Sequence, residues 1–338
     1  MNILVTGGAG YVGSVLIPKL IEDGHHIKCL DRFFFGKEFF EENFPASNLE
    51  LIQDDIRWFK PEILQNIDTV MDLAALSNDP VGELDPQKTF EINHLGRARV
   101  CKLSKEMGVS QYILASSASI YGQQDGIADE TSEVHPLTSY SKANRKAEID
   151  VLDMSDNNFT VTVLRFSSVY GTSPRMRFDI SVNSMVLELF KKQKIVVRGK
   201  SNRRPFIHIL DAVKAYLMFL NAKPDLINGE IFNVGSDEQN FQIGDLAKEI
   251  VKSIGIQCDL ELGDTQDHRS YTTSFKKINE KIGYSTEHSL KQGVKEIFED
   301  LKSNKISDNL KTITLEWYKE IQTNSKLREQ FLLNEKIL

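Results

Sequence analysis

Apolar and polar positions alternate in a regular order along the N-terminal segment. Apolar residues form short runs at 2–6 and 26–30, each of a length typical of a strand. Between the runs lies a stripe of apolar residues at helical spacing, formed by Val12, Val15, Leu16 and Leu20. Gly24 stops this helix before the second strand begins. The order of strand, glycine-rich turn, helix and strand is typical of a mononucleotide-binding βαβ unit.

Further apolar runs continue this pattern along the chain. Strands are predicted at 49–52, 69–73, 111–115, 160–164, 195–198 and 260–262, and another ends at 232–235. Helices are predicted at 86–107, after the proline-bearing loop within 135–148, at 243–254, and in the charge-rich segment 296–338. The phenylalanines of 33–40 predict a local core in a loop or irregular helix. The alternative is a hydrophobic rim near a bound cofactor.

The glycine-rich turn TGGAGYVGS at 6–14 carries the first candidate chemistry. Gly7 permits a tight turn, Gly10 lets backbone approach a pyrophosphate, and Gly13 lets the helix pack closely. Phosphates then bind the free N–H groups at the helix N-terminus. Asp31 ends the second strand, where a carboxylate accepts hydrogen bonds from an adenosine ribose. The alternative is a mobile loop, but the flanking strand and helix favour a dinucleotide site.

Composition and charge narrow the class of protein. At 338 residues the chain exceeds one typical domain and can bury a large core. The net charge of −7, without a basic block, argues against nucleic acid as the main partner. Cys29, Cys101 and Cys258 are too widely spaced to predict a disulfide framework or a metal cluster. No apolar run approaches the roughly 18 residues of a membrane span, so we expect a soluble cytoplasmic protein without signal peptide or metal.

Later motifs carry a resemblance to a known family. They are SSASIYG at 116–122, HPLTSYSKANRKAE at 135–148, LRFSSVYG at 164–171 and NRRPFIHILDAVKAY at 202–216. With the GxxGxxG spacing of the first turn, they resemble the extended short-chain dehydrogenase/reductase superfamily, specifically its NAD-dependent nucleotide-sugar epimerase/dehydratase family. The similar subgroup includes UDP-glucose 4-epimerase and, through SPRMRFDISVN at 173–183, GDP-heptose 4-dehydrogenase-like proteins.

The resemblance implies an α/β fold built on a doubly wound parallel sheet, the Rossmann fold. Residues 1–170, joined by roughly 203–237, would form the NAD-binding domain. Residues 171–202 and 238–300 would form a smaller, discontinuous substrate lobe. Residues 301–338 would form a helical C-terminal tail.

The resemblance also implies NAD as cofactor and assigns residues to it. They comprise Gly7, Gly10, Tyr11, Val12, Gly13, Asp31, Arg32, Asp55, Ile56, Leu73, Ala74, Ala75, Asn93, Ser116, Tyr140 and Asn144. Within this set Asn93 has a structural role, because its amide steadies nearby backbone. Asp31 favours NAD over NADP because it would repel a 2′-phosphate, although an arginine at position 32 is able to accept one.

The implied chemistry is reversible hydride transfer at a sugar hydroxyl carbon, with C4 expected. Tyr140 is the expected base, Ser117 orients the reacting oxygen, and Ser119 supplies a second hydroxyl. In 4,6-dehydratases an Asp and a Glu follow the Ser117 position, whereas Ala118 and Ser119 stand here. The sequence therefore disfavours sugar dehydration. A net nucleotide-sugar dehydrogenase or ketoreductase stays an alternative, because it would share every site residue.

The helix that carries Tyr140 departs from the family pattern at the position of its lysine. The expected lysine four residues after Tyr140 is Asn144, so the usual positive charge beside the base is missing. Lys142 lies roughly 200° around a regular helix of about 3.6 residues per turn, so it cannot simply replace that lysine. Oxidised nicotinamide would then be the main remaining cation, unless Lys142 reaches the site through a distorted turn. The substitution is also the one feature that favours a non-catalytic protein binding NAD or a nucleotide-sugar.

The expected partner is a nucleotide-diphospho-sugar, and a homodimer is expected. Residues assigned to the substrate are Ser77, Arg175, Arg177, Asn183, Arg204 and Arg269. Arg204 is the leading contact to the diphosphate, because a guanidinium donates hydrogen bonds in pairs. A solvated loop is an equal alternative for Arg175 and Arg177. His208 and Asp211 match the family motif but are expected to be structural.

Overall fold

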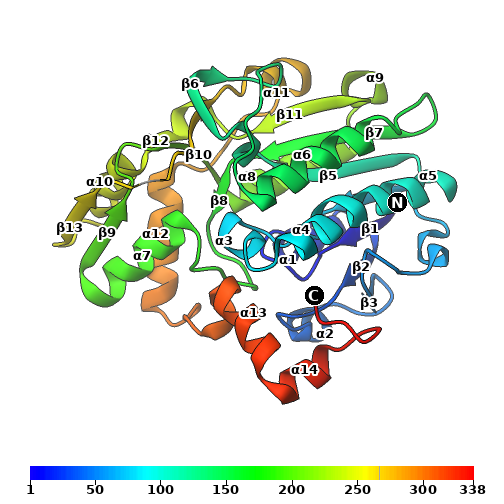
Figure 1. The fold of residues 1–338 in the computed structure, drawn as a ribbon, viewed down its shortest axis with the longest axis horizontal. Coiled ribbons are helices and arrows are strands. Elements are labelled where there is room, and N and C mark those ends of the chain that lie inside the picture. The colour runs from blue at the N-terminus through cyan, green and yellow to red at the C-terminus, as the bar shows by residue number, and fades with distance from the viewer. Residues whose placement is uncertain (266) are drawn as a thin grey trace.

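A computed structural model describes residues 1–265 and 267–338. Gln266, within the predicted lobe segment 238–300, lies outside the described residues. The centre of the molecule is a seven-stranded sheet with the order β11-β7-β5-β4-β1-β2-β3 (Figure 1). Its strands are β1 Asn2–Thr6, β2 His26–Asp31, β3 Leu49–Gln53, β4 Thr69–Asp72, β5 Gln111–Ser117, β7 Thr160–Phe166 and β11 Glu230–Val234. Every neighbouring pair runs parallel, so the predicted doubly wound parallel sheet is confirmed.

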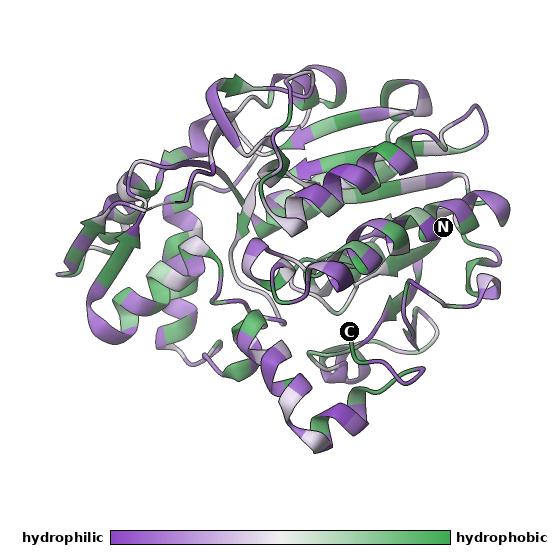
Figure 2. Cartoon of the chain, viewed as in Figure 1, coloured by the Kyte–Doolittle hydropathy of each residue, from purple (hydrophilic) through white to green (hydrophobic). Residues whose placement is uncertain are grey.

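Helices cover both faces of this sheet. Ile3 and Val5 pack in one core with α1 Gly13–Glu22 and α8 Ile209–Leu220. Leu4 packs in a second core with α5 Arg97–Glu106 and α6 Ser139–Leu152. A strand buried on both faces reads as a continuous apolar run, as at 2–6. Figure 2 shows the same arrangement, with apolar colour along the strands and on stripes of the helices.

The predicted helix at 86–107 is present but is not regular throughout. It begins as α4 Pro86–Phe90, passes through a π-helical turn at Glu91–Gly96, and continues as α5. A π-helical turn adds a residue to the helix and is frequent at functional sites. The turn shifts the register of Arg97 and later residues relative to a regular helix.

A second group of elements lies beside one end of the sheet (Figure 1). It contains three small sheets, formed by β12 Asn240–Gln242 with β10 Arg203–His208 and β8 Ser168–Tyr170, by β13 Asp259–Gly263 with β9 Lys194–Arg198, and by β14 Ser270–Thr273 with β6 Gln123–Ala128. Its helices α7 Ser181–Lys192, α10 Ile243–Ile254 and α12 Leu290–Lys302 share a core. Shorter helices elsewhere in the chain are α3 Asp79–Gly82, α9 Pro224–Ile227 and α11 Lys276–Ile282, and short 3-10 turns lie at Pro61–Leu64, Ala118–Tyr121, Asp237–Gln239 and Leu310–Thr312. The division of the chain into domains stays a prediction.

The C-terminal segment folds back onto the start of the sheet. It forms α13 Thr314–Thr323 and α14 Ser325–Phe331, drawn in red in Figure 1, while α2 Glu38–Asn43 connects β2 to β3. The ring of Phe34 lies 5.6 Å from that of Tyr318 and 5.4 Å from that of Phe331. Trp317 donates from Nε1 to the carbonyl of Phe34 at 2.7 Å. Phe34 and Phe35 therefore form a core with the tail, whereas Phe39 and Phe40 pack on each other and on Phe44, as the predicted local core implied.

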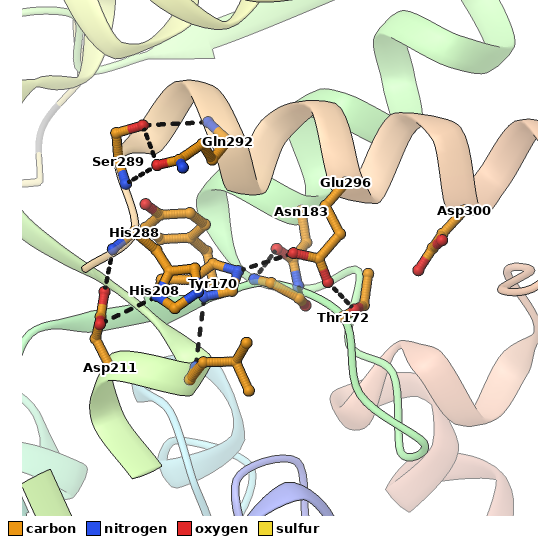
Figure 3. Close-up of polar contacts among 12 residues, drawn as sticks. Tyr170, Thr172, Asn183, His208, Asp211, His288, Ser289, Gln292, Glu296 and Asp300 are labelled. Carbon is orange, nitrogen blue, oxygen red and sulfur yellow. Dashed lines mark hydrogen bonds and ion pairs between the residues drawn. The ribbon is translucent and has the colours of Figure 1, made fainter. Parts of the chain in front are cut away.

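His208 and Asp211 join the start of α8 to α12 (Figure 3). The Asp211 carboxylate accepts hydrogen bonds from the backbone N–H groups of Glu287 and His288 at 2.8 and 3.0 Å. The His208 ring stacks on that of His288 with centroids 4.6 Å apart, and its Nε2 lies 3.3 Å from Glu296. Both residues have the structural role that their motif suggested. No helix among residues 1–265 and 267–338 is long and apolar enough to cross a membrane.

Candidate active site

A cleft of about 560 Å³ opens at the carboxyl ends of the strands of the large sheet. This edge is where open α/β sheets bind ligands. Its lining includes these residues assigned from sequence: Gly7, Gly10, Tyr11, Val12, Gly13, Asp31, Arg32, Asp55, Ile56, Leu73, Ala74, Ala75, Ser77, Ser116, Ser117, Ser119, Tyr140, Arg175, Arg177, Arg204 and Arg269. One continuous cleft therefore joins the predicted cofactor and substrate residues.

The glycine turn has the geometry of a dinucleotide cradle. Gly7 has a φ of 66°, and a Cβ there would lie 2.7 Å from the backbone of Ala74. A Cβ at Gly13 would lie 2.4 Å from the carbonyl oxygen of Gly8, so the start of α1 packs directly on the turn. A Cβ at Gly10 would meet only the carbonyl oxygen of Gly7, at 3.0 Å. The backbone at Gly10 is thus open for the approach of a pyrophosphate.

Asp31 is held at the tip of β2 by backbone. Its carboxylate accepts from the N–H of Ala9 at 3.0 Å and from the N–H of Phe33 at 2.7 Å. Burial raises the pKa of Asp31, while these two N–H groups oppose that shift. A carboxylate fixed in this way has lone pairs left for ribose hydroxyls, so the turn and strand together fit NAD.

Tyr140 lies in the first turn of α6, at the centre of the cleft. Thr138 caps this helix by accepting from the N–H of Ser141 at 3.1 Å, and the N–H of Thr138 donates to Ser141 Oγ at 3.0 Å. A Cβ at Gly82 would lie 2.8 Å from Cβ of Tyr140, so α3 packs tightly against the tyrosine. The capping box and this contact fix the position of the phenol.

Burial and several neighbouring groups shift the pKa of the Tyr140 phenol. Burial raises the pKa of Tyr140 above its usual value, and Asp79 adds to the rise. The positive charge of Arg97 and the neighbouring Ser117 and Asn144 side chains lower it. Ser117 Oγ also donates to Ser119 Oγ at 2.9 Å and accepts from the N–H of Ser119 at 3.1 Å. The two predicted hydroxyls thus lie together beside the predicted base.

Arg204 and Arg269 lie close together at the far end of the cleft. Arg269 makes ion pairs with Asp79 and with Asp267, the latter at 2.6 Å. Arg204 donates to the carbonyl of Arg269, and its Nη2 lies 3.7 Å from Asp267. Although burial raises the pKa of Asp267, its hydrogen bonds from Arg269 lower it overall. The guanidiniums of both arginines therefore lie at a site that opens into the cleft.

Comparison with known proteins assigns the chain to a family. A model of the NAD dependent epimerase/dehydratase family matches residues 3–235. The chain belongs to this family. UDP-glucuronic acid decarboxylase 2 of Arabidopsis thaliana is 28% identical over 324 residues, which cover 91% of this chain and 70% of that protein. A putative UDP-glucose 4-epimerase of Methanocaldococcus jannaschii is 27% identical over 312 residues, covering 89% of this chain and 99% of the relative.

A solved structure agrees with the fold. The UDP-glucose 4-epimerase of Thermotoga maritima, determined with UDP-glucose, has a TM-score of 0.75 and 26% identity. The match covers 90% of this chain and 100% of that one. The chain is thus an NAD-dependent enzyme with a Rossmann fold, as the motifs implied.

The Arg32 guanidinium is bonded to groups of the protein itself, a carboxylate and two backbone carbonyls. Its Nη1 lies 2.9 Å from Asp55, and its Nη2 donates to the carbonyls of Phe331 at 2.7 Å and Lys336 at 3.2 Å. Asp55 is shared with Arg57, which it contacts at 2.8 Å. Although burial raises the pKa of Asp55, the arginines lower it overall. Arg32 therefore binds the C-terminal tail, which the sequence did not indicate.

Three assigned residues do not line the cleft. Asn93, in the π-helical turn, bonds both the N–H and the carbonyl of Leu76 at 2.8 and 3.0 Å, which supports the loop from behind. Asn183 is fully buried and donates to the Tyr11 hydroxyl at 3.1 Å rather than facing a ligand. Asn144 is likewise buried, one layer below the cleft surface. Asn93 and Asn183 thus hold backbone and side chains around the site, and the assignment of Asn183 to the substrate stays a prediction.

Arg175 and Arg177 are not solvated. Arg175 lies over the ring of Phe35 at 3.6 Å and donates to Thr314 at 2.9 Å, so it faces the cofactor side of the cleft near Asp31. Burial lowers the pKa of Arg175 to about 9. Arg177 donates to the carbonyl of Ser77 at 3.1 Å and pairs with Asp179 at 2.8 Å. The solvated-loop alternative is wrong for both.

Some lining residues were missed by reading the sequence. They are Arg97 after the π-helical turn and Tyr318, Ile337 and Leu338 of the tail. Arg97 is one of several charged residues in its helix, so no signal in the sequence distinguished it. Nothing in the family motifs marks the tail, which reaches the cleft through contacts distant in sequence.

Proposed function

We propose that this enzyme is a nucleotide-sugar 4-epimerase that acts on a UDP-sugar. Tyr140 removes the proton from the C4 hydroxyl, and Ser117 hydrogen-bonds and orients the same oxygen. NAD supplies the hydride acceptor when bound. The cleft then has to retain the ketone while the sugar turns, so that hydride returns to the opposite face of the carbon.

The observation that carries this proposal is the position of Tyr140 and Ser117 between the two halves of the cleft. The glycine turn and Asp31 lie on one side of them, and Arg204 and Arg269 on the other. Such an arrangement fits a dinucleotide and a second diphosphate meeting at the phenol. The two relatives and the solved epimerase all carry UDP-sugar names, which favours uridine as the nucleoside.

Dehydration and net oxidation are less well supported. Ala118 and Ser119, which follow Ser117 in a short 3-10 turn, have no group able to protonate and deprotonate C5 and C6. A net dehydrogenase or ketoreductase would share the same residues and would differ in releasing the ketone. The decarboxylase relatives imply a further outcome, loss of CO₂ from a 4-keto sugar acid, if the substrate carries a C6 carboxylate. The expected homodimer and cytoplasmic location stay predictions.

Incubation with a panel of UDP-, GDP-, CDP- and dTDP-sugars tests the proposal. We expect the protein with added NAD to convert a UDP-hexose into its C4 epimer, identified by mass spectrometry and NMR of the products. Accumulation of a ketosugar with stoichiometric NADH would favour the dehydrogenase, and loss of CO₂ would favour the decarboxylase. Conversion of none of these sugars would contradict the proposed function.

Replacing Arg204 or Arg269 with Ala should weaken UDP-sugar binding while leaving NAD affinity nearly unchanged. A charge-assisted hydrogen bond contributes roughly 1.5–3 kcal/mol. The existing pairs with Asp79 and Asp267 favour the lower part of that range, because a diphosphate has to compete with them. Calorimetric titration with each ligand measures both affinities.

Arg203→Ala is the matched control. Arg203 precedes Arg204 on β10, is exposed, and is absent from the cleft lining, so its removal should leave both affinities unchanged. Equal losses of NAD and UDP-sugar affinity in the Arg204 and Arg269 variants would contradict their assignment to the substrate.

A further inference from the structure

Arg97 is a buried arginine whose guanidinium is held beside Asn144. It begins α5 directly after the π-helical turn and is 2% exposed. Its Nε donates to the carbonyl of Ala74 at 2.9 Å, and its Nη1 donates to Asn144 Oδ1 at 2.8 Å. The residue lines the cleft at the loop that follows β4. Two hydrogen bonds thus fix the guanidinium between the cofactor loop and the helix of Tyr140.

This cation makes no ion pair with any described residue, a property uncommon for a buried arginine. Among residues 1–265 and 267–338, no carboxylate oxygen lies within 4.0 Å of it. Asp72 lies in its surroundings, but the oxygens of this carboxyl instead accept from Thr6 Oγ1 and Tyr112 Oη at 2.5 Å each. Burying an unpaired charge is costly, so its retention suggests a task that needs the charge.

We propose that Arg97 is the positioning residue that supplies positive charge to Tyr140, in place of a lysine at position 144. Asn144 connects the two residues. It lies one helical turn after Tyr140 on α6, and it accepts a hydrogen bond from the Arg97 guanidinium. The inference rests on the proposed function in that it makes Tyr140 the base. In this proposal Arg97 takes the place of the two sources of positive charge for Tyr140 that were considered from the sequence, which are Lys142 and the oxidised nicotinamide.

The other charged groups around Tyr140 do not provide this charge. Lys142 is exposed on α6. Arg177 is paired with Asp179, and Arg269 is paired with Asp267 and Asp79, so their charges are largely balanced. Asp79, on α3, adds negative charge near the phenol, and Tyr216 and Tyr271 are neutral phenols facing it. Arg97 is the cation near Tyr140 without a carboxylate partner in the described chain.

The sign of the effect follows from the two protonation states. A nearby cation favours the phenolate over the neutral phenol, so it lowers the pKa of Tyr140 against the rise caused by burial. Removing the charge should therefore raise this pKa. When the pKa of Tyr140 is higher, its phenolate forms only at higher pH, and sugar oxidation then also requires a higher pH.

The test is titration of Tyr140 in NAD-bound protein made with tyrosine carrying an NMR-active isotope at Cζ. The resonance of Tyr140 is assigned by its loss in Tyr140→Phe. We expect Arg97→Gln, which keeps hydrogen-bond donors but removes the charge, to raise the midpoint by roughly one to two pH units. Arg97→Lys retains the charge and should stay near the native midpoint.

A second-site variant distinguishes this role from a structural one. Asn144→Lys in the Arg97→Gln background restores a cation beside Tyr140 and should return the midpoint toward the native value. If Arg97 served only to balance the charge of Asp72, the new lysine would not restore the midpoint. Asn144→Asp keeps Arg97 but neutralises it with a new carboxylate, so the midpoint should rise even where Arg97→Gln does not fold. A midpoint that moves in neither variant overturns the proposal.

The pH profile of sugar conversion provides the second readout. In Arg97→Gln the pH optimum of sugar conversion should rise together with the NMR midpoint. In the Arg97→Gln/Asn144→Lys double variant, both values should return toward those of the native protein. Failure of the native protein to convert any sugar would contradict the proposed function but leave the NMR result to decide on Arg97. Normal turnover with an unmoved midpoint in both Arg97→Gln and Asn144→Asp would reject the role of Arg97 alone.

Discussion

Tyr140→Phe is expected to lower sugar turnover by about 10²–10⁴-fold, the range for loss of a positioned general base. The substitution removes only the hydroxyl, so packing against Gly82 and the cap at Thr138 should stay intact. Steady-state rates with the UDP-sugar identified in the panel measure the loss. NAD binding, measured by calorimetry, should stay within a few-fold of the native value.

Tyr271→Phe provides the matched control for Tyr140→Phe. Tyr271 also lines the cleft, but its ring lies against Arg204 at 4.9 Å rather than beside Ser117. Its loss of a hydroxyl should therefore leave most of the turnover. A Tyr140→Phe enzyme that keeps most activity would require a different base.

NADP is expected to bind roughly a hundredfold more weakly than NAD, or weaker. A 2′-phosphate would approach the Asp31 carboxylate, and like charges brought together at a binding site cost several kcal/mol. Arg32 is not free to offset this cost, because Asp55 and the carbonyls of Phe331 and Lys336 already hold its guanidinium. Calorimetric or fluorescence titration with both cofactors measures the ratio.

Asp31→Asn separates the two contributions to this preference. It removes the repulsion while leaving an acceptor for the ribose, so the ratio of NADP to NAD affinity should rise. Arg32 would stay bound to the tail, so the variant should not come to prefer NADP. Tighter binding of NADP than of NAD by the native protein would show that Arg32 leaves the tail to bind phosphate.

The features predicted correctly from sequence depend on short-range signals. The run at 2–6 and the spacing of Gly7, Gly10 and Gly13 are local patterns, and the turn, helix and Asp31 follow from them within one βαβ unit. Tyr140 was assigned through the resemblance to the family motif, and the structure places it in the first turn of a capped helix that lines the cleft. The parallel order of the strands followed from the resemblance and is confirmed by their register.

The features that were missed depend on contacts between distant residues. The π-helical turn carries Asn93, which bonds to Leu76 on another segment, and an apolar stripe does not indicate either feature. Arg97 contacts Asn144 from another helix, and Arg32 contacts Phe331 from the far end of the chain. Neither pair shows a periodic pattern in sequence. Such charged and hydrogen-bonded partners lie far apart in the sequence, so they are identified only in the folded structure.

The fate of hydrogen at C4 tests the central claim most directly. The enzyme is incubated with NAD and the UDP-hexose it converts, labelled with deuterium at C4, and the product is analysed by NMR and mass spectrometry. Reversible transfer within one cleft predicts a C4 epimer that keeps its deuterium at C4, without net formation of reduced cofactor. Deuterium lost from the sugar to released cofactor, with a ketosugar as the product, would contradict the account.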